Sequence, residues 1–159
     1  RSYRDLPVRL AQPLRGHVQY RIDPGVLLYH LDQNSWPPEP NGMWISGSGR
    51  SEIIMRTAFP VEYVQFEAES PVPTVVTVSL GSTPVTVALQ PKRTAYFNVP
   101  ATGVRGFGDF NYLLVTHSTE GFVPHLLEPA NMDYRNLGAQ LRFRPVTPTE
   151  ASAGRTLPK

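Results

Sequence analysis

Hydrophobic and polar residues alternate with a period of two over several short stretches of this chain. In the stretch VEYVQFEAE (61–69), for example, Val64 and Phe66 fall on one face, and Gln65 and Glu67 fall on the other. This alternation is typical of a β-strand that packs one face against a core and turns the other toward solvent. We therefore expect strands rather than helices to build this protein.

The strongest hairpin signal lies in the middle of the chain. TVVTVSL (74–80) and PVTVALQ (84–90) are rich in β-branched residues, and the short linker Gly81-Ser82-Thr83 separates them. A second hairpin is expected where Asp-Pro-Gly (23–25) separates two apolar runs, because Pro fixes φ and Gly accepts a positive φ.

The strand pattern predicts one domain of the all-β class. Stretches with strand character lie at 17–22, 26–31, 43–46, 51–57, 61–69, 74–80, 84–90, 94–100, 111–118 and 139–146. We expect about nine strands, since their spacing of roughly ten residues is typical of a sandwich or barrel. The prediction is a single antiparallel β-sandwich of jelly-roll type over 17–146, with extended arms at 1–16 and 147–159.

Two segments between the predicted strands are expected to be irregular. Residues 101–110 contain three glycines and read as a loop, and residues 121–138 read as a long excursion between two strands. Such long connections often carry function.

Composition supports the all-β prediction and limits the classes of partner. Charged residues make up 18% of the 159 residues, below the usual ~25%. The 17 prolines and 12 glycines oppose long helices. The net charge is +2, from 15 Lys and Arg against 13 Asp and Glu, and the basic residues are scattered. A nucleic-acid interface needs a basic patch or stripe, so no nucleic-acid partner is expected.

The absence of cysteine removes several kinds of chemistry. With no Cys in the chain, disulfide frameworks, thiolate catalysis and Cys-ligated zinc are excluded. No apolar run approaches the ~20 residues of a transmembrane helix, so no membrane span is expected. The sequence begins with Arg1 rather than methionine, and we therefore expect that a segment preceded it, such as a signal or an anchor.

Both tryptophans lie at the ends of one proline-rich stretch, HLDQNSWPPEPNGMW (30–44). One interpretation is a platform on which a sugar or a peptide stacks, with Trp36 beside Pro37 as the better surface candidate. The polar residues that would bind hydroxyl groups are Asp32, Asn34, Glu39 and Asn41. The other interpretation is that Trp36 and Trp44 close the two ends of the sandwich core.

The excursion at 121–138 holds the second group of candidate residues. Its polar members are His125, Glu128, Asp133, Tyr134, Arg135 and Asn136. They would form a ligand site, for which Asp133, Tyr134 and Arg135 are the main candidates. Alternatively, the segment packs as a loop over the sandwich edge, with Arg135 paired to Asp133 or Glu128. The leucines that would anchor it are Leu126, Leu127 and Leu137.

Signals for catalysis and metal binding are weak, and the chain is not expected to be an enzyme. GSGRS (47–51) lacks the GxSxG spacing of a nucleophile elbow, and GFGDF (106–110) lacks the lysine of a phosphate loop. The four histidines show no HxH or HExxH spacing, so no metal centre and no cofactor are expected. The one alternative kept open is a structural calcium held by Asp32, Glu52 and Asp133.

The order of several segments resembles a known family. WPPEPNGMWISGSGRSEIIMRT is followed by a Val/Thr hairpin, then by GFVPHLLEP, then by DYRNLGAQLRF with its D-x-R-x-L-G pattern. Over residues 18–146, this order is similar to the extracytoplasmic C-terminal β-sandwich domain of bacterial membrane-embedded glycosyltransferases of the mannosyltransferase type. The resemblance implies an accessory sandwich outside the cytoplasm. It carries over no catalytic residue.

The sequence thus predicts a non-enzymatic interaction module. It would be an accessory or structural subunit that docks on other protein subunits of an extracytoplasmic, membrane-associated assembly. Arginines at the edges and in the N-terminal arm would make the contacts: Arg1, Arg4, Arg9, Arg142 and Arg144. The alternative function is carbohydrate binding through Trp36 and its polar neighbours.

Overall fold

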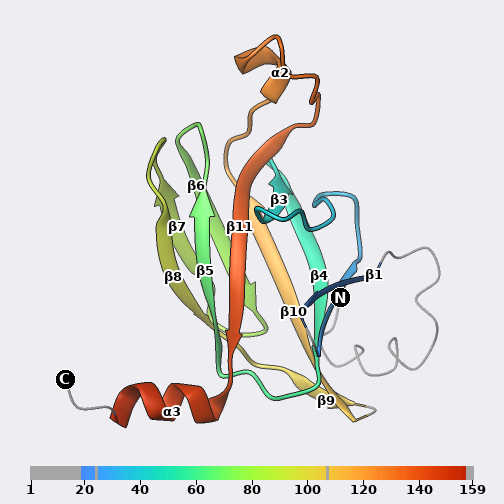
Figure 1. The fold of residues 1–159 in the computed structure, drawn as a ribbon, viewed down its shortest axis with the longest axis vertical. Helices are drawn as coiled ribbons and strands as arrows, with labels where there is room; N and C mark the ends of the chain where they lie inside the picture. Colours follow the sequence, from blue (N-terminus) through green and yellow to red (C-terminus); the bar gives the residue numbers. More distant parts are fainter. Residues whose placement is uncertain (1–18, 24, 107, 157–159) are drawn as a thin grey trace.

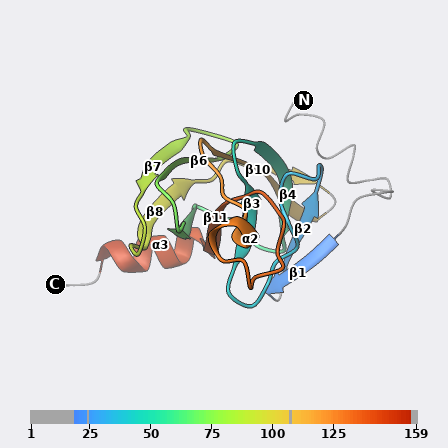
Figure 2. The ribbon, with the colours of Figure 1, turned by 90° about the horizontal axis from the view of Figure 1, so that it is seen from above.

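The computed structural model of the chain describes residues 19–23, 25–106 and 108–156, and it shows a sandwich of two antiparallel sheets (Figure 1). The larger sheet follows the order β1(Gln19–Asp23), β2(Val26–His30), β4(Arg50–Thr57), β10(Asp109–Ser118), β6(Thr74–Leu80) and β7(Val85–Leu89), and β9(Val104–Gly106) also pairs with β10. The smaller sheet follows the order β3(Met43–Ser46), β11(Leu137–Val146), β5(Tyr63–Glu69) and β8(Ala95–Pro100). Seen from above, the larger sheet curves from β7 to β1 around the smaller one (Figure 2). The predicted all-β sandwich is confirmed.

The core lies between the two sheets and is built by the alternation seen in the sequence. In β5, Val64 and Phe66 are buried, whereas Gln65 is exposed. The ring of Phe66 lies 5.5 Å from the rings of both Phe97 and Phe143, which come from the two neighbouring strands. The inward positions are apolar on every strand of the small sheet, and its opposite face carries polar and aromatic side chains, such as Gln65 and Tyr96.

Both expected hairpins are present. The β6–β7 pair has Thr74 opposite Leu89, and Gly81 between the two strands has a φ of 78°. The β1–β2 pair places Asp23 opposite Val26, and Gly25 has a φ of 79°. Glycine adopts such a backbone without steric cost, which explains why these turns form at these positions.

The segment 101–110 is not the loop that its glycines predict. It contains β9 and the beginning of β10, which pair with Val104 opposite Asn111. β6 pairs with β10 only from Leu114 onward, so the first residues of β10 would otherwise lack a partner on that side. β9 supplies their backbone hydrogen bonds over a stretch too short to show a periodic pattern.

The C-terminal segment corrects the prediction of an extended tail at 147–159. Pro148–Thr156 form helix α3, at the end of the sandwich opposite the short helix α2(Pro124–Leu127) (Figure 1). The side chain of Thr147 accepts a hydrogen bond from the Glu150 N–H at 3.2 Å, and the Glu150 carboxylate accepts one from the Thr147 N–H at 3.4 Å. This reciprocal pair is a capping box, with proline at the first helical position. The expected N-terminal arm at 1–16 lies outside the described residues.

A buried tyrosine joins the two sheets where the chain crosses between them. The hydroxyl of Tyr112 in β10 accepts a hydrogen bond from the Val61 N–H at 2.7 Å, just before β5 begins. Burial raises the pKa of Tyr112, and the hydrogen bond from Val61 opposes that shift.

None of the helices in the described part of the chain is long and apolar enough to cross a membrane.

Candidate binding cleft and apolar tip

The excursion between β10 and β11 rises from one end of the sandwich and carries α2 (Figure 1). Its base is closed by a backbone pair between Phe122 and Leu137, whose N–H groups each donate to the other's carbonyl at 2.8 Å. Gly47 and Gly121 pack against each other here: a Cβ on either glycine would collide with the Cα of the other and with the side-chain oxygen of Asn136. The Asn136 amide also donates to the Gly47 carbonyl at 3.2 Å. Glycine at these two positions therefore fixes where the excursion leaves the sheet.

Within the excursion, local hydrogen bonds replace regular secondary structure. The His125 N–H donates to the Asp133 carbonyl at 2.9 Å, and its ring Nδ1–H donates to the Asn131 carbonyl at 2.9 Å. The ring of His125 also lies 4.5 Å from that of Tyr134. These contacts hold the two arms of the excursion together.

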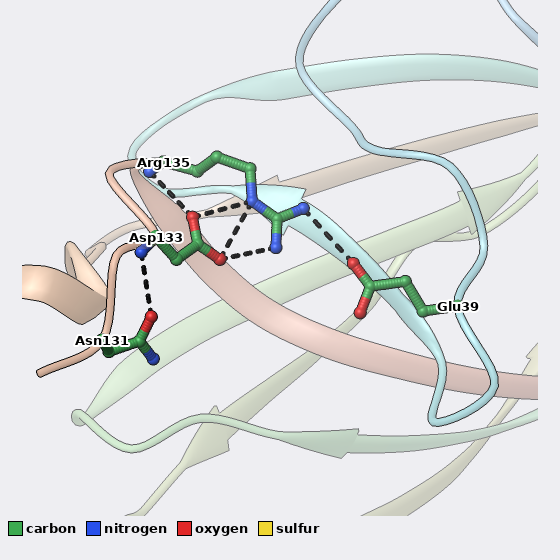
Figure 3. Close-up of polar contacts among 4 residues, drawn as sticks. All are labelled: Glu39, Asn131, Asp133 and Arg135. Carbon is green, nitrogen blue, oxygen red and sulfur yellow. Dashed lines mark hydrogen bonds and ion pairs between the residues drawn. The ribbon is translucent and has the colours of Figure 1, made fainter.

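Arg135 is the centre of a polar cluster that ties the excursion to the proline-rich segment (Figure 3). Its Nε and Nη2 donate to the two carboxylate oxygens of Asp133 at 2.9 and 2.6 Å. Its Nη1 lies 3.4 Å from the Glu39 carboxylate. The Asp133 N–H in turn donates to the Asn131 side chain at 2.9 Å. The predicted pairing of Arg135 with Asp133 is confirmed, and Glu39 joins it in place of Glu128.

The cluster holds Asp133 in its charged form. Hydrogen bonds from the Arg135 guanidinium lower the pKa of Asp133, and the same contact raises the pKa of Arg135. The guanidinium also lies over the ring of Trp36, at 5.4 Å from its centroid. Trp36 is half-buried and serves as a stacking partner for Arg135 within the protein.

Trp44 lies on the outer face of the small sheet, so the interpretation that it closes the core is wrong. Its neighbours Met43 and Ile45 are the residues of β3 that enter the core, and the pleat directs Trp44 the other way. The ring of Trp44 packs edge to face with Phe122, with centroids 5.6 Å apart. The two tryptophans therefore have different roles and do not form one platform.

An open cleft of ≈ 730 Å³ lies over this part of the small sheet. Its floor includes Trp44, Gln140 and Glu69, which stand side by side on β3, β11 and β5. The remaining lining residues come from the connections around the floor and from the first residue of β11: Glu39, Ser70, Pro71, Pro91, Lys92, Arg93, Thr94, Phe122, Pro124, Asn131, Asp133, Arg135 and Leu137. Strands thus provide a fixed floor, and four loops provide the walls.

The predicted hydroxyl-binding residues are only partly brought together. Glu39 lines the cleft, but Asp32, Asn34 and Asn41 do not. Both carboxylate oxygens of Asp32 accept backbone N–H groups, from Asn34 at 2.9 Å and from Glu52 at 2.8 Å. Asn34 donates its side chain to the Arg50 carbonyl at 2.8 Å. Asp32 and Asn34 therefore shape the β2–β3 connection.

The carboxylates proposed for calcium do not form a common site. Across the described ranges, no three His, Asp or Glu side chains gather closely enough to hold a metal ion, and this includes Asp32, Glu52 and Asp133.

His30 is buried in β2 and its Nδ1 lies 2.9 Å from the Ser35 hydroxyl. Burial lowers the pKa of His30, and the nearby charge of Asp32 partly opposes this shift.

The arginines predicted to contact a partner are engaged within the protein where the structure describes them. Arg142 pairs with Glu67 at 3.0 Å and with Glu69 at 3.1 Å. Arg144 pairs with Glu150 of α3 at 3.1 Å. Both lie on the outer face of the small sheet, where they border a hollow of ≈ 380 Å³ beside the exposed Tyr96. Arg1, Arg4 and Arg9 lie outside the described residues.

The far end of the excursion exposes an apolar surface, which we call the apolar tip. It consists of Leu126, Leu127, Met132 and Tyr134, which are 77%, 58%, 69% and 60% exposed. Among the described residues, these are four of the five large hydrophobic side chains that are exposed. The expectation that Leu126 and Leu127 anchor the loop is wrong, because only Leu137 is buried.

Several cleft residues gave no signal in the sequence. Gln140 and Phe122 lie in stretches that show only strand or loop character, and Lys92 and Arg93 read as an ordinary turn. The cleft forms because strand pairing brings positions 44, 69 and 140 together, which no local pattern encodes.

Comparison with family models, with curated proteins and with solved structures gives no match for this chain.

Proposed function

We propose that this chain is a non-enzymatic interaction module that docks on another protein subunit of an extracytoplasmic assembly. The observation that carries the proposal is the apolar tip, in which Leu126, Leu127, Met132 and Tyr134 are exposed on a segment that projects from the sandwich (Figure 1). Clustered exposed apolar side chains, as opposed to scattered ones, mark interaction surfaces.

The energetic argument follows from burial of these side chains. Moving a leucine from full exposure to full burial stabilises a complex by about 1.5–3 kcal/mol. Leu126 and Leu127 are adjacent and both mostly exposed, so a partner pocket that receives them gains most of that amount twice. A few such anchors supply most of the affinity of a typical interface.

The charges around the apolar tip favour a protein partner over a bilayer. Glu128 follows directly after Leu127 and is exposed, and Asp133 lies between Met132 and Tyr134 in the chain. The guanidinium of Arg135 is already paired with Asp133 and Glu39. An anionic membrane surface attracts clusters of Lys and Arg and repels carboxylates. A pocket on a protein accommodates the same pattern.

The state of Asp133 supports binding rather than catalysis. General acids and bases work best with a pKa near the operating pH. Hydrogen bonds from Arg135 lower the pKa of Asp133, which moves it further from neutral pH. Asp133 therefore stays a charged hydrogen-bond acceptor. The resemblance of the segment order to extracytoplasmic accessory sandwiches supports the location, and it agrees with a role as a subunit.

The experiment places a photo-activated crosslinking amino acid at Leu127 and, as a control, at Ala88, which is exposed on β7 of the other sheet. The protein is expressed in its source cells and irradiated before extraction. We expect a discrete protein adduct from position 127 that position 88 does not give. The double variant Leu126→Ser with Met132→Ser should weaken that adduct at least tenfold, while Tyr96→Ser should leave it unchanged. Lipid adducts alone, or equal adducts from both positions, would refute docking on a protein.

A further inference from the structure

We infer that the cleft over the small sheet binds an acidic saccharide. In this arrangement a pyranose ring lies against Trp44 and Phe122, and a carboxylate or phosphate substituent lies beside Lys92 and Arg93. The inference stands on a different surface from the apolar tip and does not depend on the docking proposal.

The floor of the cleft has the side chains that a sugar ring requires. Gln140 lies opposite Trp44 on one side and opposite Glu69 on the other, so an indole, an amide and a carboxylate form one row across three strands. A pyranose has an apolar face of C–H groups and a rim of hydroxyls. The indole accommodates the apolar face, and planar amide and carboxylate groups accept or donate hydrogen bonds at the rim.

The size and rigidity of the cleft fit a small polar ligand. Its ≈ 730 Å³ falls within the ~300–1,000 Å³ of typical ligand sites. The walls contain Pro71, Pro91 and Pro124, whose fixed φ angles limit how far the loops can move. Little ordering entropy is then lost when a ligand binds.

The charged groups of the cleft indicate whether an acidic or a neutral sugar fits. Three carboxylates line it, but each already has partners inside the protein. Glu69 accepts a hydrogen bond from Thr94 at 2.6 Å and pairs with Arg142 at 3.1 Å. Asp133 and Glu39 share Arg135.

Two cations in the cleft have no carboxylate partner in the part of the chain that the structure describes. Within the described ranges, neither Lys92 nor Arg93 forms an ion pair, and both are exposed on the turn between β7 and β8. Lys92 has a φ of 64°, in the left-handed region that non-glycine residues adopt uncommonly. An anionic substituent on the ligand would serve as the partner of Lys92 and Arg93, because guanidinium and ammonium groups bind carboxylates and phosphates well.

The position of the cleft argues against an extended peptide as its ligand. Peptides that bind to sheets usually add to an exposed edge strand, because their main chain then completes the hydrogen-bond ladder. Here the floor is the face of β11 and its neighbours on both sides. One neighbour, β3, is an edge strand, but its outer edge is occupied: the Trp36 N–H donates to the Trp44 carbonyl at 3.0 Å, and the Ser46 N–H donates to the Asn34 carbonyl at 2.9 Å. Only side chains are offered to the ligand, as a hydroxyl-rich molecule requires.

The two tryptophans allow a direct test by NMR. Each gives one indole N–H signal in a ¹H–¹⁵N spectrum, and the variant Trp36→Phe assigns both. Oligogalacturonate, a neutral oligosaccharide of equal length and an acidic peptide are titrated separately. We expect oligogalacturonate to shift the Trp44 signal and to leave that of Trp36 in place, since Trp36 does not line the cleft.

Charge variants then test the role of the cations. Lys92→Gln with Arg93→Gln should weaken oligogalacturonate binding about tenfold, as the loss of two partly exposed charge contacts predicts. The matched control, Arg50→Gln with Arg105→Gln, removes two exposed cations elsewhere and should leave affinity within twofold. The inference is overturned if the Trp44 signal stays fixed. It is also overturned if the peptide or the neutral sugar binds as tightly, or if both double variants weaken binding equally.

Discussion

Replacing Arg135 with methionine should loosen the excursion without unfolding the sandwich. Methionine keeps the length of the side chain but removes the charge and all of its donors. The variant loses two ion pairs, to Asp133 and Glu39, and the stacking on Trp36. The side chain of Arg135 is 30% exposed, so these contacts are partly screened by water.

The size of the effect can be worked out from those contacts. Partly exposed ion pairs contribute about 0.2–1 kcal/mol each, and a cation over an aromatic ring contributes about 0.5–1 kcal/mol at such a site. The sum is about 1–3 kcal/mol of local stability. Since about 1.4 kcal/mol corresponds to a factor of ten, the excursion should open roughly 5–100 times more often.

Hydrogen exchange measures this opening residue by residue. The His125 amide, bonded to the Asp133 carbonyl, reports the excursion, and amides of β10 report global unfolding. We expect faster exchange at His125 and no change in β10. In the same variant, an NMR titration should show the pKa of Asp133 rising toward its usual range, because its main hydrogen-bond donor is gone.

A matched control is Arg144→Met, which removes an ion pair to Glu150 at the other end of the sandwich. It should leave exchange at His125 unchanged. If Arg135→Met also leaves that rate within twofold, the cluster does not hold the excursion, and the reasoning from its contacts is refuted.

Two further predictions concern the buried polar groups. Tyr112→Phe leaves the buried Val61 N–H without its acceptor, which should cost about 1–3 kcal/mol and lower Tm by about 2–12 °C. Tyr63→Phe, on the outer face, should shift Tm far less, and equal shifts would contradict the prediction. Because burial lowers the pKa of His30 below 6.5 in the folded state, the unfolded chain binds its proton first, and stability should fall as the pH drops below that value. His30→Asn should reduce this loss between pH 7.5 and 5.5 in urea titrations, and an unchanged loss would show that His30 is not its source.

The strands and the core were predictable because they depend on short-range periodicity. A period of two in β5 and β6 determines which side chains enter the core, whatever the order of the strands. β9 was missed because three residues cannot show a period. Helix α3 was missed because prolines and polar residues suggested a tail, although Thr147 and Glu150 have the spacing of a capping box.

The candidate site shows the same division between local and long-range information. Arg135 and Asp133 are two positions apart, so their pairing could be anticipated. Glu39, the other partner of Arg135, lies 96 positions away in the chain. The row of Trp44, Gln140 and Glu69 depends on the register of three strands, which alternation alone does not determine. Trp36 was expected at the surface because the sequence does not show that Arg135 stacks on its ring. Arg135 is also far from Trp36 along the chain.

One segment contributes to both proposed surfaces, but it does so with different side chains. The two surfaces can therefore be separated by experiment. Asp133 and Arg135 line the cleft, while their neighbours Met132 and Tyr134 belong to the apolar tip. Variants at the tip should therefore impair docking alone, and variants at Lys92 and Arg93 should impair saccharide binding alone. Arg135→Met should weaken both, since it loosens the segment that positions them. If it weakens only one, the other surface is held by the sheet and not by the Arg135 cluster.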